Sequence, residues 1–165
     1  MLIGVHIIVA SGLGSLTENP AIAFALGIAS HFIGDKIPHW EYSIAPLDEL
    51  KRKSVGEKLR TCLKKDVFRV LSFIGLEIGG AFVLVFAIVH YVAPQAHFLP
   101  VLAGGFGGLL PDVLWGFADN SKNKILQAYR RLHHASHTKA ENVSLRHGLI
   151  WQLAAVAIAI ILLDR

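Results

Sequence analysis

Histidine and aspartate side chains recur in this chain at spacings that suit metal binding. His31, Asp35 and His39 stand at i, i+4 and i+8, which places them along one face of a helix if Pro38 does not end it first. An imidazole and a carboxylate one turn apart can share a metal ion, as paired helical ligands do in zinc hydrolases. The alternative is a buried polar pair that serves packing. Because ionisable groups are costly inside apolar sequence and usually functional there, we expect His31 and Asp35 to bind metal.

A second carboxylate and a run of histidines extend this set. Asp112 follows Pro111 in an apolar segment, where the interrupted backbone ladder can direct the carboxylate into a cavity; the alternative is a cap at a helix kink. His133, His134 and His137 offer i, i+3 and i, i+4 pairs if they are helical, and the alternative is a solvated loop. We expect His137 and one of its two neighbours to bind metal. The sequence leaves open whether His133 or His134 is that neighbour, and we include His134 among the expected metal ligands.

Several charged residues near these motifs could act on a substrate. Glu77 lies about ten residues, or roughly 15 Å, into an apolar segment, where it could bind metal, act as a general base or pair with a histidine. Arg130, Arg131 and Lys139 are close to the histidine run and could hold a phosphate, although a solvated loop face would explain them equally. The single cysteine, Cys62, has no partner, so any metal must be bound by His, Asp or Glu.

The elements that must position these residues have the composition of a membrane protein. Of the 165 residues 53% are hydrophobic and 17% are charged, against about 25% charged in an average soluble domain. The apolar residues fall in five long blocks, which predict a single all-α domain: a polytopic bundle of about five transmembrane helices over 2–16, 20–39, 67–93, 98–118 and 148–163. The first block is short for a span of about 20 residues, so it must tilt, thin the bilayer or sit inside the bundle. Glycine clusters within 75–80 and 104–108 predict that the third and fourth helices pack together.

The basic residues predict how the bundle lies in the membrane. All but one of the 16 Lys and Arg residues fall in two long loops, about 40–66 and 119–147, or at adjoining helix ends. The positive-inside rule makes this face cytoplasmic, with the N-terminus inside and the C-terminus outside. We therefore attribute the net charge of +4 to topology and contact with anionic lipids, and expect no nucleic-acid partner. Ile125, Leu126, Tyr129 and Leu132, interleaved with basic residues, suit a helix on the membrane surface.

This orientation gathers the titratable residues on one side. His6 lies near the start of the first segment, His31, Asp35 and His39 in the cytoplasmic half of the second, and Asp112 near the end of the fourth. The histidine run lies in the second loop on the same face. His6 is therefore expected as a further metal ligand, with packing as the alternative.

Taken together, these motifs resemble a known family. His6 after a short apolar start, Ser-His-Phe-Ile-Gly-Asp at 30–35, Gly-Leu-Leu-Pro-Asp at 108–112 and His-His-Ala-Ser-His at 133–137 resemble the small bacterial inner-membrane proteins described as metal-dependent hydrolases. The His-x3-Asp helix is more remotely similar to one in zinc-dependent phospholipase C. Many family members continue the Pro-Asp motif with a second Asp and a His, and place that motif earlier in the chain. Here residues 113–115 are Val-Leu-Trp, so His39 or Glu77 could supply the missing ligand, or fewer ions are bound.

The sequence and the resemblance lead to one functional expectation and two rivals. We expect a metal-dependent hydrolase that uses a divalent ion, zinc being favoured, on a phosphoester of a lipid at the cytoplasmic leaflet. Glu77, Asp112 and His137 are the candidate catalytic residues. The first rival is a non-enzymatic metal carrier or sensor, and the second is a scaffold that recruits a partner through its basic loops.

Overall fold

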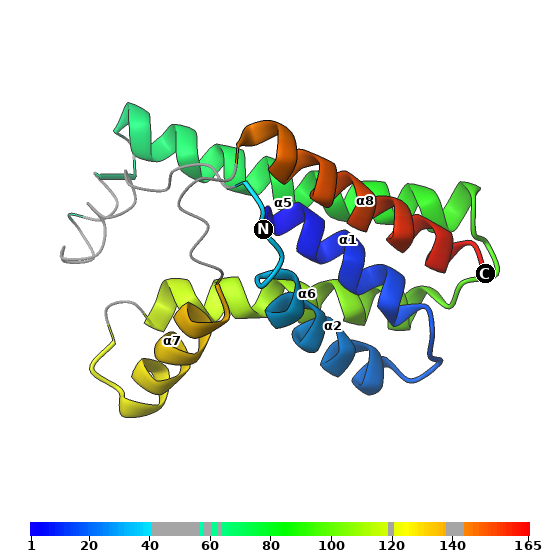
Figure 1. The fold of residues 1–165 in the computed structure, drawn as a ribbon, viewed down its shortest axis with the longest axis horizontal. Helices are drawn as coiled ribbons and strands as arrows, with labels where there is room; N and C mark the ends of the chain where they lie inside the picture. Colours follow the sequence, from blue (N-terminus) through cyan, green and yellow to red (C-terminus); the bar gives the residue numbers. More distant parts are fainter. Residues whose placement is uncertain (41–56, 58–60, 63, 119–120, 138–143) are drawn as a thin grey trace.

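The computed structural model describes residues 1–40, 57, 61–62, 64–118, 121–137 and 144–165, and these residues contain helices and no strand. Most of the first predicted loop, 40–66, and Lys139 lie outside the described residues. The expected all-α architecture is confirmed for the part of the chain that is described. Six helices appear in Figure 1: α1 (Ile3–Gly14), α2 (Pro20–Gly34), α5 (Lys65–Tyr91), α6 (Phe98–Ala118), α7 (Lys124–Ser136) and α8 (Leu145–Leu163).

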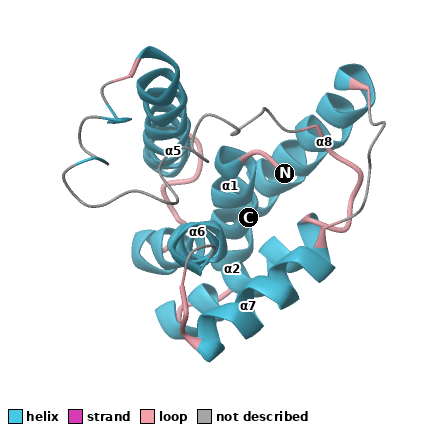
Figure 2. Ribbon diagram, turned by 90° about the vertical axis from the view of Figure 1, so that its left-hand side faces the viewer, coloured by secondary structure: helices cyan, strands magenta, loops and turns pink. Residues whose placement is uncertain are grey.

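Three of the described helices are long and apolar enough to cross a membrane, fewer than the five expected. They are α5, α6 and α8, with 27, 21 and 19 residues. The apolar helices α1 and α2 have only 12 and 15 residues. Helix α1 is apolar without being long enough to span because it lies among α2, α5, α6 and α8, where nine of its residues are buried (Figure 2). Its apolar character therefore reflects burial within the bundle, one of the three options that its length left open.

Capping residues set where the site-bearing helices begin. The Asn19 side chain accepts hydrogen bonds from the backbone N–H groups of Ala21 and Ile22, and Pro20 occupies the first turn of α2. Asn123 caps α7 in the same way. The amphipathic segment around Ile125, Leu126, Tyr129 and Leu132, for which the sequence predicts a helix, is helical and lies within α7. At its other end α2 stops at Gly34, ahead of Pro38, rather than continuing to residue 39.

The glycine clusters do not pack against each other, so that prediction is wrong. A Cβ atom on Gly104 would meet the Ala10 carbonyl of α1, and one on Gly107 would meet the Phe24 carbonyl of α2. Around Gly75 and Gly79 of α5 such an atom would meet nothing within 4 Å. Small residues permit a close approach between helices but do not determine which helix packs there. The glycines of α6 pack against α1 and α2. Helix α5 meets α6 through aromatic side chains instead, with the Phe82 and Phe106 rings 4.9 Å apart.

A hydrophobic core holds α1 against the spanning helices. Ile7 and Ile8 of α1 form one buried cluster with Val85 and Ile88 of α5 and Leu163 of α8. This core occupies the end of the bundle that contains the turn between α5 and α6. His6, near the start of α1, lies with His31, Asp35 and Asp112 at the opposite end of this helix.

Candidate metal centre

Asp35 is the hub of a buried cluster built from α1, α2, α6 and α7. Its side chain is fully buried just beyond the end of α2. Oδ1 of Asp35 lies 3.0 Å from His6 Nε2. Oδ2 lies 3.2 Å from His31 Nε2 and 3.3 Å from His137 Nε2. The two oxygens of one carboxylate thus face imidazoles from three different elements.

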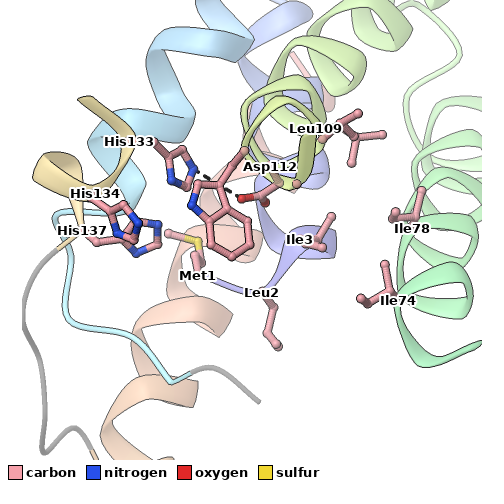
Figure 3. Close-up of a pocket in the computed structure, with 13 residues that line it drawn as sticks. Met1, Leu2, Ile3, Ile74, Ile78, Leu109, Asp112, His133, His134 and His137 are labelled. Carbon is pink, nitrogen blue, oxygen red and sulfur yellow. Dashed lines mark ion pairs between the residues drawn. The ribbon is translucent and has the colours of Figure 1, made fainter. Parts of the chain in front are cut away.

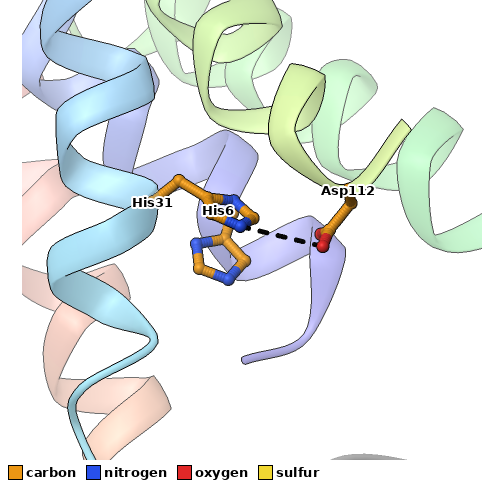
Figure 4. Close-up of side chains that lie close together, drawn as sticks. All are labelled: His6, His31 and Asp112. Carbon is orange, nitrogen blue, oxygen red and sulfur yellow. Dashed lines mark ion pairs between the residues drawn. The ribbon is translucent and has the colours of Figure 1, made fainter. Parts of the chain in front are cut away.

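Asp112 brings a second carboxylate to the same cluster from α6. Its Oδ1 lies 3.5 Å from His133 Nε2 and 3.7 Å from His31 Nε2. Figure 4 shows His6, His31 and Asp112 directed toward one another from three helices. The rings of His6 and His31 stack with their centroids 4.0 Å apart. The helix continues through Pro111, so Asp112 projects from its side rather than from an end.

Hydrogen bonds to backbone carbonyls orient two of the imidazoles. His31 Nδ1 lies 2.9 Å from the Gly108 carbonyl oxygen, and His39 Nδ1 lies 2.6 Å from that of Ile37. A carbonyl oxygen only accepts, so each Nδ1 carries a proton, and in the neutral form of the ring Nε2 then presents a lone pair. Metal-binding histidines are held in this way, with the second ring nitrogen donating to a carbonyl or carboxylate. His39 Nε2 also contacts the Met1 nitrogen.

The nitrogen and oxygen atoms of the cluster form three overlapping groups within which all donor atoms lie within 4.8 Å of one another. His31 and Asp35 each belong to two of them, so the groups make up one continuous centre. The groups are His6, His31 and Asp112; His31, Asp35 and His133; and Asp35, His39 and His137. This buried cluster could bind a metal ion.

The chemistry of the donor set fits a cation better than a proton. His31 Nε2 lies near Asp35, Asp112 and also His133 Nε2, the last at 3.3 Å. A proton on one ring nitrogen points in a single direction, whereas a metal ion can be shared by several of these atoms, as in the group of His31, Asp35 and His133. Buried carboxylates also need compensation by positive charge or hydrogen bonds. Convergent lone pairs and carboxylate oxygens are what a divalent transition metal requires.

The structure brings His133, and not His134, into the cluster. His133 is 3% exposed and belongs to a donor group, whereas His134 belongs to none of the groups among the described residues. Adjacent residues on a helix point about 100° apart, so only one of the two can face the centre. A signal for this was present in the sequence, because Leu126 and Tyr129 precede His133 by seven and four residues on one helical stripe. His134 lies off that stripe, beside the Trp115 ring.

Glu77 projects from α5, and its carboxylate lies beside the start of α1 rather than in a donor group. Its Oε1 accepts a hydrogen bond of 2.8 Å from the backbone N–H of Gly4. The first N–H groups of a helix have no partner within the helix, and a carboxylate there also suits the helix dipole. The catalytic role expected for Glu77 stays a prediction. Arg130 and Arg131 are exposed on α7, and none of the cluster contacts described above involves them.

A tyrosine fixes α7 against α6 beside the centre. The Tyr129 hydroxyl donates a 2.7 Å hydrogen bond to the Pro111 carbonyl, next to Asp112. Burial raises the pKa of the Tyr129 phenol, and the negative charges of Asp112 and Asp35 act in the same direction. The phenol therefore stays protonated and keeps its donor role. This contact sets the position from which His133 and His137 reach the centre.

A cavity of about 420 Å³ opens directly beside the cluster (Figure 3). Asp112, His133 and His137 border it, so a molecule in the cavity would touch the proposed ligands. His134 lines it as well without joining the cluster. The volume lies within the range of about 300–1,000 Å³ that is usual for small-molecule sites.

Of the seven residues expected to bind metal, the structure brings six together: His6, His31, Asp35, His39, Asp112 and His137. Comparison of the chain with protein-family models, with curated proteins and with solved structures finds no match. The case for a function therefore depends on the cluster and its surroundings.

Proposed function

We propose that this chain is a membrane-embedded, metal-dependent hydrolase that cleaves a phosphoester of a lipid at the cytoplasmic leaflet. One observation carries the proposal. Imidazoles from α1, α2 and α7 and carboxylates from α2 and α6 converge at the border of a cavity in a chain with three membrane-length helices. Ionisable residues in apolar helices are costly, so such a gathering implies a function.

Zinc is the proposed metal, because imidazole nitrogen and carboxylate oxygen are its usual ligands in the absence of cysteine. The shared residues also suggest the number of ions. Asp35 belongs to two donor groups, one with His31 and His133 and one with His39 and His137, so the cluster offers donors for more than one ion. We therefore propose two ions for each chain.

The reaction divides between the metal and the side chains around it. A bound divalent ion activates water near neutral pH and polarises the phosphoryl oxygen. Asp112 and His137, which are 22% and 30% exposed at the side chain, border the cavity, so ions that they hold would be within reach of a phosphoester in the cavity. His134 lines the cavity outside the donor groups, and we assign it the proton donated to the leaving oxygen. We assign no step to Glu77, because its carboxylate binds the Gly4 N–H.

Hydrolysis of defined phospholipids in mixed micelles tests the proposal. The purified protein should release water-soluble product, lose this activity on chelation and regain it with zinc. Asp112→Asn should abolish turnover, since it removes a charge with little change in volume. His97→Ala is the matched control, because His97 is exposed in the turn between α5 and α6 at the other end of the bundle. If the metal-replete protein cleaves no ester in a broad lipid panel, or if Asp112→Asn retains full activity, the proposal is wrong.

A further inference from the structure

The cavity beside the cluster has two chemically different ends. Its polar end is formed by the metal-centre residues and His134 on α6 and α7. Its other end is lined by aliphatic side chains from three helices: Ile3 of α1, Ile74 and Ile78 of α5, and Leu109 of α6. Figure 3 shows Ile74 and Ile78 across the cavity from the histidines, with Asp112 between the two ends. The cavity is thus shaped for a molecule that is polar at one end and apolar at the other.

The cavity reaches the surface of the bundle on the side of α5 and α6, where two of its lining residues on α6 are exposed. Val113 lines the cavity and is 40% exposed. Gly116, one turn beyond Asp112, also lines it, and a Cβ atom there would meet nothing within 4 Å. Both flanking helices are long and apolar enough to span a membrane. The mouth between them would therefore face lipid tails rather than water.

The energetics of such a mouth favour a ligand that is already in the bilayer. Lipid tails are as apolar as aliphatic side chains, so moving an acyl chain from the bilayer into the cavity gains little hydrophobic free energy and costs little. A water-soluble molecule would leave the apolar end unfilled. The cavity thus lets a chain stay in apolar surroundings while its headgroup reaches the metal centre.

We infer that the apolar end holds one acyl chain of the substrate, which enters sideways from the bilayer between α5 and α6. Ile74, Ile78 and Gly116 then determine which lipids are accepted. This inference depends on the proposed function for the identity of the substrate, but chain binding can be measured without turnover.

Quenching of Trp115 fluorescence by a brominated lipid tests the inference directly, because Trp115 lines the cavity. The other tryptophans, Trp40 and Trp151, are replaced by Phe. The protein is placed in phosphatidylcholine vesicles that contain increasing fractions of phosphatidic acid brominated along the chain. Occupancy of one site should saturate at a low mole fraction, whereas contact with surrounding lipid rises in proportion to that fraction.

A filled variant and a matched control separate the cavity from the lipid-facing surface. Gly116→Leu with Ile74→Phe fills the mouth, and Ile74→Phe alone is a milder form should the double variant fold poorly. Leu76→Phe with Gly79→Leu adds the same side chains at α5 positions outside the cavity lining, where Leu76 is 75% exposed and Gly79 has open space. The filled variant should lose most of the saturable quenching and the control should keep it. Overpacking of the mouth should also lower kcat/KM for the phospholipid by roughly tenfold or more, whereas the control variant should leave it unchanged.

The outcomes distinguish this inference from the proposed function. Quenching that rises only in proportion to brominated lipid, or that is equal in the filled and control variants, would overturn the chain-binding cavity. Saturable quenching that the filled variant loses, in a protein that hydrolyses nothing, would support the cavity and overturn the hydrolase.

Discussion

At the scale of single residues, Asp35 carries more of the candidate centre than any other side chain. It is fully buried and contacts His6, His31 and His137 through both oxygens. A buried carboxylate in this position is stable only with compensating positive charge or several hydrogen bonds. The N-terminal nitrogen of Met1 lies 3.5 Å from Oδ1 of Asp35, and a metal ion held by His31, Asp35 and His133 would add positive charge.

Asp35→Asn and His134→Gln should therefore have opposite signatures. Asp35→Asn removes the shared charge and should strip the metal from the purified protein, which elemental analysis measures. His134→Gln should retain the metal, because His134 is outside the donor groups, and should lower kcat by about a hundredfold to ten-thousandfold as the loss of a general acid does. Full metal content in Asp35→Asn would show that the cluster is packing, and an unchanged kcat in His134→Gln would remove its assigned role.

The residues of the centre were predictable to different degrees for physical reasons. The pair His31 and Asp35 follows from helical spacing alone, because both lie on one element. The choice between His133 and His134 depends on which face of α7 meets α6, and that is set by contacts such as Tyr129 with Pro111. The hydrogen bond between Glu77 and the Gly4 N–H was not predictable from the sequence, because it joins two helices that are far apart along the chain.

At the scale of elements, the packing of α1 and α2 on α6 positions the centre. Gly104, Gly107 and Gly108 allow these backbones to approach, and His6, His31 and Asp112 then meet. The apolar blocks in the sequence predicted where these helices lie along the chain, but not which helices pack against one another. Hydropathy cannot separate a helix buried by protein from one covered by lipid, which is why α1, with nine buried residues, was counted as a span. Helix α2 was counted as a span because its apolar block was expected to continue to residue 39, whereas the helix ends at Gly34.

A pair of alanine substitutions tests this packing. In Gly107→Ala the new methyl group would meet the Phe24 backbone, which cannot rotate away, so the bundle should lose about 1–3 kcal/mol of stability. Gly79→Ala adds the same group to open space on α5 and should be neutral or slightly stabilising. Thermal unfolding in detergent, followed by circular dichroism, compares the two variants. Equal melting temperatures would mean that α6 is not in close contact with α2.

At the scale of the whole molecule, helices of unequal length place the centre below the surface. Helix α5 has 27 residues and α1 has 12, so they are about 40 Å and 18 Å long. The turns at one end lie level, because His97 pairs with Glu18 at 3.5 Å and the Ser15 hydroxyl donates to the Leu162 carbonyl. At the other end α1 therefore starts partway along α5, beside Glu77. This leaves a recess beyond the start of α1, between the longer helices, and the cavity and the donor groups lie in this recess.

This arrangement makes the orientation of the chain testable. The open end of the recess carries the starts of α5 and α8 and the end of α6, and described basic residues such as Lys64, Lys122 and Arg146 lie at or next to these helix ends. By the positive-inside rule it should face the cytoplasm, where the lipid headgroups of that leaflet can reach the centre.

In a Cys62→Ser background, cysteines at Lys64 and Lys122 should react with a membrane-impermeant thiol reagent only from the cytoplasmic side. A cysteine at Gln95, in the turn between α5 and α6, should react only from the other side, and it serves as the matched control. Labelling of Lys122→Cys from outside the cell would place the centre at the opposite leaflet, and labelling of Lys122→Cys and Gln95→Cys from the same side would mean that α6 does not cross the membrane.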